Sequence, residues 1–547
     1  MKAEIVSELF SKALKEIGIT EEYEFVFETP KNPDHGDLST NIAMRLSKQL
    51  QKNPRQVAEE IVAKLENQSP LIDNINIAGP GFINIKFTPK FYAEVISKLH
   101  AKGENIGRSE FGKGVKVNVE YVSVNPTGLL HLGHGRNACL GDTIANLYQW
   151  TGHQVTREYY FNNAGNQMQN LAKSIYARYM QIIDGEQFPF PEDGYHGEYI
   201  KEIAKEVFAA YKKELVENNY QNMTTIRKYG ENWCFEKINK TLGRMLIKQD
   251  VFYNEDTLYN SGKINELIEI FKEKELSYEK EGATWLKFSE MGLKDDRVIV
   301  KSTGEPTYRL PDIAYHREKF RRGFDLIIDI FGADHIATIP DVMAGVKALG
   351  YDDKKIKPVI HQFVTLTENG EQVKMSKRTG KSYTLDDLLD EVGADVVRFF
   401  LLMRGVSTHL EFDLGLAREQ SDKNPVFYLQ YANARISSVV DNAIEAGADM
   451  SGEVNFELLI HPREISLINE AINFDRIIKS ATLKCEPQVL ADYLRALAAE
   501  FHAFYHDCRI IGVDAELQKA RIALAKTAKN IIKNGLTILG ISVPERM

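Results

Sequence analysis

The stretch VKVNVEYVSVNPTGLLHLGHGRNACLGDTIANLY, residues 115–148, has the pattern of a strand, a turn and a helix in immediate succession. Valines alternate through residues 115–124, a Pro126-Thr-Gly128 turn follows, and an apolar-periodic helix opens near Gly133. Such a corner directs backbone N–H groups and the positive end of a helix dipole toward a bound anion. The stretch therefore predicts an α/β fold with a phosphate-binding site at the edge of a parallel sheet.

Two histidines, His131 and His134, stand at the start of this expected helix. Being three residues apart, they share one face of the first turn, and Gly133 between them lacks the Cβ that would block a flat ring or a phosphate. Zinc binding is the alternative for such a pair, but the sequence offers no third and fourth ligand at metal-ligand spacing. The pair therefore predicts nucleotide binding without a protein-bound metal.

A second motif, KMSKRTG at residues 374–380, supplies positive charge. Lys374 and Lys377 follow an Asn369-Gly370 turn on a polar loop, which would let them close over a bound triphosphate. A lysine-rich loop on its own is usually a solvated loop. Because this loop follows the histidine pair in the chain, it favours a nucleotide-activating site in which the lysines stabilise charge that grows on the phosphates.

In this order the two motifs resemble the signatures of the class I aminoacyl-tRNA synthetases, with Arg378 where the second signature ends in serine. Further segments look like the bacterial arginyl-tRNA synthetases specifically. Those in the middle of the chain are VEYVSVNPT (119–127), EYYFNNAGNQ (158–167) and DIAYH (312–316). Those similar to the family's additional N-terminal domain and to its C-terminal part are HGDLSTNIA (35–43), AGPGFIN (78–84), PVFYLQYANAR (425–435) and PERM (544–547).

Three domains are expected from the changes of pattern along the chain. Residues 1–105 combine helices, one of them capped by Asn53, with a hairpin across Gly79-Pro-Gly81, and so form an α+β unit. Residues 113–410 alternate strands with helices, as in a Rossmann-like parallel-sheet domain, and carry a helical insertion at about 192–276. Residues 411–547 have helical periods and no strand run, which predicts an all-α bundle. The strands expected in the middle domain are residues 115–124, 297–301, 326–331 and 359–366.

Arginine recognition requires acceptors arranged in a plane, because the guanidinium group carries five donors and a permanent charge. The resemblance implies that Glu120, Tyr308 and Asp312 take the guanidinium. It also implies that Asn125 helps to hold the α-amino and carboxylate end of the substrate. Tyr308 precedes Asp312 by four residues, or one helical turn, which would place both side chains on one side of a helix.

The resemblance also assigns the ATP side of the site. It implies that the catalytic residues are His131, His134, Lys374 and Lys377, and that further ATP contacts come from Gly133, Asp334, His335, Met375 and Ser376. Asp334 and His335 follow the expected strand 326–331, at the edge of the sheet where ligands bind. Asn163 and Gln167 are similar to a family segment that lines the site, and Mg²⁺ should accompany the ATP.

Charge and aromatic residues suggest how tRNA would be bound. The formal net charge of −9 argues against indiscriminate coating of nucleic acid, but it permits local basic patches. Lys519, Lys526 and Lys533 recur along an acid-free stretch and predict a basic helix face. Tyr428 and Tyr431 offer rings for unstacked anticodon bases. The alternatives are a solvated face for the lysines and half-buried packing for the tyrosines.

The resemblance implies an enzyme that activates L-arginine with ATP to arginyl-adenylate and transfers it to the terminal ribose of tRNA(Arg). A class I synthetase for cysteine is one alternative, against which the lack of zinc-ligand cysteines counts. A catalytically inactive tRNA-binding paralogue is the other, against which the intact motifs count. No segment approaches the roughly 18 apolar residues of a membrane span. A cytoplasmic protein is therefore expected, and the resemblance implies a monomer.

Overall fold

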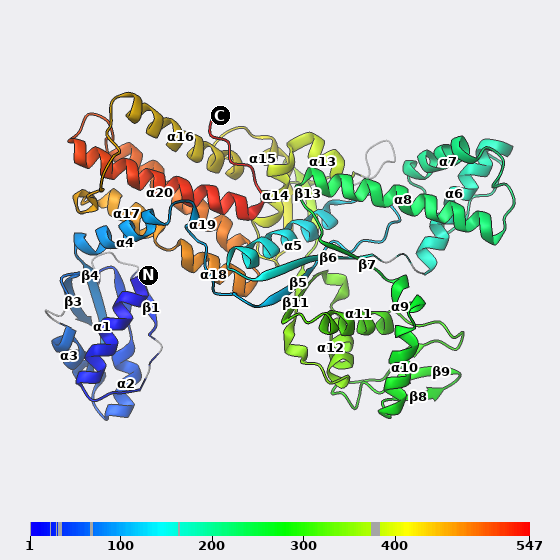
Figure 1. The fold of residues 1–547 in the computed structure, drawn as a ribbon, viewed down its shortest axis with the longest axis horizontal. Coiled ribbons are helices and arrows are strands. Elements are labelled where there is room, and N and C mark those ends of the chain that lie inside the picture. The colour runs from blue at the N-terminus through cyan, green and yellow to red at the C-terminus, as the bar shows by residue number, and fades with distance from the viewer. Residues whose placement is uncertain are drawn as a thin grey trace.

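The fold is taken from a computed structural model, which describes residues 2–21, 23, 25–28, 30, 35–65, 69–161, 163, 165–373 and 383–547. A five-stranded sheet lies near the centre of the molecule, with every neighbouring pair parallel (Figure 1). Its order is β12-β11-β5-β6-β7, and its strands are β5 (Lys116–Glu120), β6 (Gln154–Phe161), β7 (Val251–Asn254), β11 (Leu326–Gly332) and β12 (Ile356–His361). The predicted parallel-sheet α/β fold is confirmed.

Helices cover both faces of the parallel sheet. Helix α5 (Leu132–Trp150) follows β5 and is buried along most of its length, because it packs on the sheet on one side and on helices of the C-terminal bundle on the other. Helix α11 (Arg309–Arg321) precedes β11, and α12 (Ile339–Ala348) follows it. In Figure 1, α5 lies above the sheet and α11 below it. The central strand is thus covered on both faces, as its valine-rich sequence requires.

The helical insertion begins earlier than the predicted 192–276. Helices α6 (Asn166–Asp184), α7 (Glu198–Tyr211) and α8 (Tyr220–Arg244) pack around a core of their own. Strand β7 falls inside the predicted helical range but belongs to the parallel sheet. Helical periodicity alone did not separate these elements, because β7 is only four residues long and its burial pattern is mixed.

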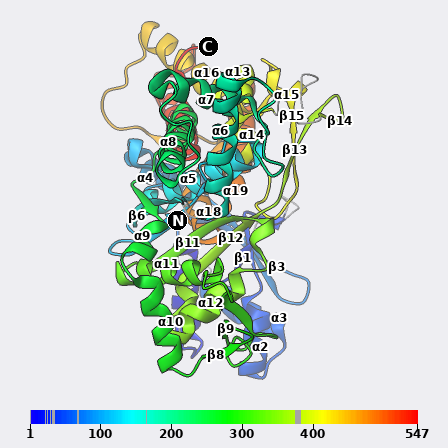
Figure 2. The ribbon, with the colours of Figure 1, turned by 90° about the vertical axis from the view of Figure 1, so that its right-hand side faces the viewer.

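A second lobe lies on the other side of the sheet. It contains α9 (Asp256–Asn260), α10 (Lys263–Glu273), β8 (Ser277–Lys280), β9 (Ala283–Leu286) and β10 (Arg297–Val300). The strand predicted at 297–301 is therefore real, but it lies in an antiparallel sheet of order β10-β9-β8 and not in the parallel one. Figure 2 looks onto both lobes, with α6–α8 above the sheet and α10, β8 and β9 below it.

The strand predicted at 359–366 is two strands. Strand β12 ends at His361 and β13 (Val364–Glu368) begins a small separate sheet with β14 (Glu371–Gln372) and β15 (Leu410–Asp413). Strand β15 also lies at the start of the region predicted to be free of strands. Its pairing with β13 joins segments far apart in the chain, and local pattern does not reveal such contacts. The connecting helices are α13 (Leu385–Val392), α14 (Ala394–Leu402) and α15 (Leu414–Arg418).

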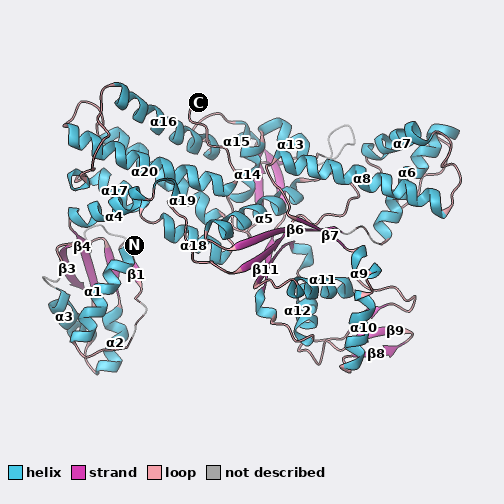
Figure 3. Cartoon of the chain, in the orientation of Figure 1, coloured by secondary structure: helices cyan, strands magenta, loops and turns pink. Residues whose placement is uncertain are grey.

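The remaining C-terminal residues are helical, as predicted (Figure 3). The bundle consists of α16 (Pro425–Glu445), η5 (Phe456–Leu458), α17 (Pro462–Ala471), α18 (Phe474–Lys484), α19 (Gln488–Asp507) and α20 (Ala515–Leu539). Helix α20 is central, since it contacts α16, α17, α19 and helix α5 of the sheet domain. In the part of the chain described above, no helix is both long enough and apolar enough to cross a membrane.

The N-terminal unit is α+β, with an antiparallel sheet of order β1-β2-β4-β3. Its elements are α1 (Lys2–Glu16), β1 (Phe27–Glu28), β2 (Leu38–Thr40), α2 (Ile42–Leu50), α3 (Pro54–Leu65), β3 (Ile72–Ala78), β4 (Phe82–Phe87) and α4 (Pro89–Ala101). The predicted hairpin is β3–β4, and the Asn53 side chain accepts a hydrogen bond from the Arg55 N–H at 2.9 Å at the start of α3. Helix α4 packs on α17, α20 and η5, and so connects the N-terminal unit to the bundle (Figure 1).

Candidate active site

A cavity of about 860 Å³ opens at the carboxyl ends of the parallel strands. Its walls come from the turn after β5, the first turn of α5, the start of α11, the short helix η3 (Ala333–His335) and the link between β12 and β13. This is the edge at which parallel α/β sheets bind ligands, because loops and helix starts converge there. The corner between β5 and α5, at which the sequence predicts a phosphate-binding site, forms part of the cavity wall.

The two histidines of the first motif stack on each other at the start of α5, with ring centroids 3.4 Å apart. His131 is the N-cap, and its Nδ1 accepts a hydrogen bond from the Gly133 N–H at 3.1 Å. The His134 Nδ1 accepts one from the His131 N–H at 3.2 Å. Because both Nδ1 atoms act as acceptors, the proton of each neutral ring sits on Nε2.

Burial keeps this histidine pair uncharged. It lowers the pKa of His131, and burial together with the neighbouring His131 and His361 lowers the pKa of His134 to about 3. Both rings line the cavity, so they offer neutral N–H donors and no positive charge at pH 7. Gly133 also lines the cavity, and a Cβ there would lie 3.1 Å from the His131 ring.

The turn after β5 is strained. Val122 and Ser123 adopt φ values of 69° and 44°, which a β-branched valine rarely does. Asn137 on α5 stabilises this turn by accepting a hydrogen bond from the Val122 N–H at 2.6 Å and donating one to the Ile330 carbonyl at 2.8 Å. Asn137 was not predicted, because only the folded structure brings these three segments together.

The four predicted arginine-binding residues all line this cavity. Glu120 is the buried last residue of β5, and Asn125 donates a hydrogen bond to Gln167. Tyr308 is the N-cap of α11 and is 55% exposed, whereas Asp312, one turn later, is half-buried. The expected helical turn between Tyr308 and Asp312 is present.

Asp312 differs from the other acids of the site because its carboxylate has no ion pair within the described part of the chain. Burial raises the pKa of Asp312 to about 7. Glu255, buried near Tyr160 and Tyr259, also lacks an ion pair among the described residues, and burial raises its pKa as well. The sequence analysis missed Glu255, since a single glutamate between β7 and α9 carries no motif. A cationic substrate would supply the positive partner that neither carboxylate has among the described residues.

On the nucleotide side, Asp334 and His335 lie in η3 at the cavity wall, where the His335 ring stacks on Phe331. Lys374, Met375, Ser376 and Lys377 lie outside the described residues. Gln167 lines the cavity as expected. Asn163 does not: its amide donates to Glu231 on α8 at 3.1 Å, because the chain turns away from the sheet after β6.

The predicted basic stripe on α20 is largely engaged in contacts within the protein. Lys519 is buried and donates a hydrogen bond to the Ser451 carbonyl. Lys533 forms a 2.8 Å ion pair with Glu104, which follows α4. Of the three, Lys526 alone forms no hydrogen bond or ion pair within the described part of the chain. The spacing of the lysines indicated one helix face, but it did not reveal that this face packs against other elements.

The tyrosines of α16 lie in an aromatic and cationic cluster. Tyr431 is 40% exposed, stacks with Phe427 at 6.3 Å and lies 5.8 Å from the Arg435 guanidinium. Tyr428 is half-buried against His502. An exposed ring beside a guanidinium can stack on a nucleobase.

A parallel sheet whose ligand edge carries a histidine-bearing helix start is the arrangement of a class I aminoacyl-tRNA synthetase. The family model described as "tRNA synthetases class I (R), catalytic domain" matches residues 95–398. Two other models flank it: "Arginyl tRNA synthetase N terminal domain" matches residues 4–87 and "DALR anticodon binding domain" matches residues 429–547.

Relatives agree over nearly the whole length. The arginine–tRNA ligase of Salinibacter ruber is 46% identical over 546 residues, or 97% of each chain. A structure from Campylobacter jejuni assigned as an arginyl-tRNA synthetase is 32% identical, covers 84% of this chain and all of its own, and has a TM-score of 0.76. The Thermus thermophilus arginyl-tRNA synthetase, at 20% identity, shares the fold over both whole chains with a TM-score of 0.78.

The chain belongs to the arginyl-tRNA synthetase family. The predicted function, ATP-dependent ligation of arginine to tRNA, is thereby confirmed, and neither the cysteine enzyme nor an inactive paralogue is favoured. Enzymes of this class use ATP, and the ligase activity implies arginine and tRNA as substrates.

Proposed function

We propose that the cavity binds arginine and ATP side by side, with the guanidinium at Asp312 and the triphosphate at the His131–His134 pair. The observation that carries this proposal is the chemical difference between the two ends of the cavity. One end holds Asp312, and Glu255 behind it, neither of which has an ion pair among the described residues, while the other presents neutral imidazole N–H donors. A guanidinium suits the first end and phosphate oxygens suit the second.

At the arginine end, Asp312 balances the charge of the guanidinium and Tyr308 covers it at the mouth of the cavity. Glu120 provides a fixed acceptor, and Asn125 faces the α-amino and carboxylate end. These roles are supported by the fact that all four residues line the same cavity. The guanidinium replaces the solvent that burial removes from Asp312, so binding favours the ionised carboxylate.

The pH dependence of arginine binding tests this assignment. Because the pKa of Asp312 is raised to about 7, the carboxyl group is ionised above pH 7 and protonated below it. We expect the dissociation constant for arginine to rise roughly 10-fold between pH 8 and pH 6, since the protonated group offers no charge to the substrate. Calorimetric titration with arginine alone measures this. A constant affinity over that range, or the same slope in Asp312→Asn, would contradict the assignment.

At the ATP end, His131 and His134 donate to the phosphates, Gly133 leaves room for them, and Asp334 and His335 lie beside the adenosine. No lysine or arginine lines the cavity among the described residues. The positive charge for the triphosphate therefore comes from Lys374 and Lys377, with Met375 and Ser376 between them, and from the Mg²⁺ that ATP brings as part of the substrate complex.

For tRNA, the stacking surface on α16 is better suited than the lysine stripe, because Tyr431 is exposed and Lys519 and Lys533 are engaged within the protein. Tyr428 lies at the edge of the same surface. Lys526 stays a candidate for a phosphate contact. A monomeric state and a cytoplasmic location remain part of the proposal.

Replacing Tyr431 with alanine should weaken tRNA binding by about 10-fold, because base stacking on an aromatic ring contributes roughly 1–3 kcal/mol. Affinities for ATP and arginine should not change, since α16 lies away from the cavity (Figure 1). Tyr220→Ala is the matched control, because Tyr220 is 90% exposed at the start of α8. Equal tRNA affinities in the two variants and the parent would remove Tyr431 from the anticodon site.

A further inference from the structure

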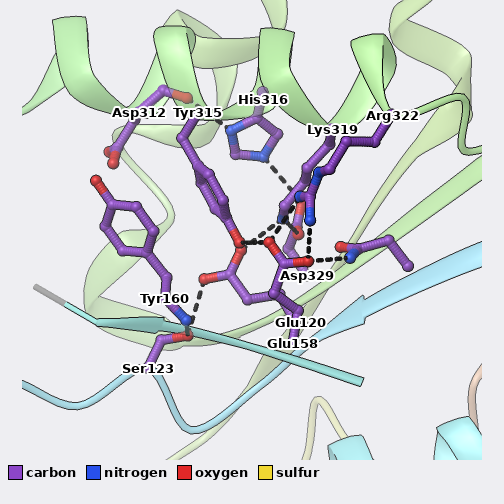
Figure 4. Close-up of polar contacts among 11 residues, drawn as sticks. Glu120, Ser123, Glu158, Tyr160, Asp312, Tyr315, His316, Lys319, Arg322 and Asp329 are labelled. Atoms are coloured by element: carbon purple, nitrogen blue, oxygen red, sulfur yellow. Dashed lines mark hydrogen bonds and ion pairs between the residues drawn. The ribbon is translucent and has the colours of Figure 1, made fainter. Parts of the chain in front are cut away.

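One face of α11 carries an unusual series of polar side chains toward the sheet. Asp312, Tyr315, His316 and Lys319 follow each other at helical spacing, and Arg322 comes directly after the helix (Figure 4). Lys319 has no exposed surface, and Tyr315 and His316 are nearly as buried. Burying so many polar groups is unfavourable unless each has a partner. The partners of these side chains therefore indicate the role of this face of α11.

The partners are three carboxylates in a row across the sheet. Asp329 on β11 is in register with Glu120 on β5, and Glu120 is in register with Glu158 on β6. Neighbouring strands are about 4.8 Å apart, so three buried carboxylates in line would repel each other strongly. The row is stable only if cations are placed along it.

Three basic groups from α11 and its end provide those cations. Lys319 Nζ lies 2.5 Å from Glu120 Oε2 and 2.6 Å from Asp329 Oδ1. Arg322 donates two hydrogen bonds to Glu158, at 2.6 and 2.7 Å. His316 faces Asp329 at 3.0 Å through Nε2 and the Asp312 carbonyl at 2.8 Å through Nδ1, so both ring nitrogens face acceptors, as in an imidazolium.

The directions of the pKa shifts agree with this pairing. Although burial opposes ionisation, Asp329 and Glu120 raise the pKa of Lys319, and Lys319 and His316 lower the pKa of Asp329. Burial likewise opposes ionisation of Glu158, but Arg322 holds its pKa below the ordinary value. The row thus places three acids against three bases.

Glu120 and Asp329 are the members of this row that line the cavity, and Glu120 is held from two sides. Its Oε2 accepts from Lys319, and its Oε1 accepts from the Ser123 hydroxyl at 2.9 Å, in the strained turn after β5. Glu120 lines the cavity, whereas Lys319, Glu158 and Arg322 do not. Lys319 therefore controls a substrate-facing carboxylate from behind the cavity wall.

We infer that Lys319 is the positioning residue of the arginine pocket: it fixes the Glu120 carboxylate and cancels its charge, and so leaves Asp312 to balance the guanidinium. This inference rests on the proposed place of arginine at Asp312. Glu120, held in place and with its charge balanced by Lys319, still accepts hydrogen bonds. It therefore selects for the planar arrangement of guanidinium donors more than for positive charge. The compact ammonium of lysine gains less from such an acceptor.

The test is Lys319→Met, which keeps the length of the side chain and removes its charge. We expect the KM for arginine to rise about 10- to 100-fold, the preference for arginine over lysine to fall, and the KM for ATP to stay unchanged. Arg322→Met is the matched control, because it also removes a cation from the row but from beside Glu158, and the half-buried Arg322 does not line the cavity. In that variant thermal stability should fall while the KM for arginine stays within about threefold of the parent value.

A second variant separates positioning from folding. Lys319→Met combined with Asp329→Asn removes one cation and one anion, so the numbers of acids and bases in the row are again equal. Glu120 still lacks the Lys319 ammonium in this variant. Its thermal stability should recover and its KM for arginine should remain high. A parental KM in either folded Lys319 variant, or an equal rise in Arg322→Met, would overturn the inference. If the parent itself failed to charge tRNA with arginine, the proposed function would fall instead.

Discussion

Asp312→Asn should raise the KM for arginine about 100-fold or more and leave the KM for ATP within about twofold of the parent value. Asparagine keeps the size of the side chain but loses its charge, and one of its two acceptors becomes a donor that faces the guanidinium donors. The ATP end of the cavity is formed by other side chains, so it should not respond. Steady-state charging assays with each substrate varied in turn provide both constants. If Asp312→Asn weakened ATP binding and left arginine binding at the parental value, Asp312 would have to be assigned to the nucleotide end of the cavity.

The same substitution should stabilise the protein in the absence of substrate. A carboxyl group whose pKa is raised to about 7 in the folded chain disfavours folding at every pH above its ordinary pKa, and this cost grows with pH until it is complete above about pH 7. The gain from Asp312→Asn should therefore be largest at pH 8, as much as about 4 kcal/mol in the free energy of unfolding, and should vanish toward pH 4. Thermal melting at both pH values measures it. A less stable variant at pH 8 would mean that the Asp312 carboxylate has a cationic partner in the folded protein.

Lys377→Ala should slow arginyl-adenylate formation by about 100- to 1,000-fold with little effect on the melting temperature. The described lining of the cavity contains no lysine or arginine, and the histidine pair is neutral, so we expect the loop lysines to supply the positive charge that the protein gives to the triphosphate. Lys381→Ala is the matched control, because it removes a lysine just outside the motif. Pyrophosphate exchange in the presence of tRNA reports the step. An equally large loss of rate in Lys381→Ala would mean that Lys377 contributes only to the overall charge of the loop.

Local patterns predicted the parts of this molecule that local physics determines. The corner from β5 to α5, the Asn53 cap and the β3–β4 hairpin each depend on residues within a few positions of one another. The same holds for the placement of His131 and His134 at a helix start.

Contacts between distant segments account for what the sequence did not predict. The run at 297–300 has the composition of any short strand, and only its pairing with β9 assigns it to the antiparallel sheet. Lys519 has the spacing of a solvated stripe but is buried on a central helix. Lys319 pairs with Glu120, which is far away in the chain, and Glu255 is a single acid between two short elements, so no local motif marks either residue. Their signal in the sequence is limited to charged residues on the buried side of a helix or at the end of a strand, and single-sequence analysis does not identify which side is buried.

The most direct test of the central claim, that arginine is recognised at Asp312 for transfer to tRNA, is a charging assay with purified protein, ATP, bulk tRNA and each amino acid in turn. The parent and Asp312→Asn are compared side by side. We expect the parent to charge tRNA with arginine only and the variant to lose that charging at arginine concentrations near the parental KM. Charging with another amino acid by the parent, or charging with arginine at the parental rate by Asp312→Asn, would contradict the account.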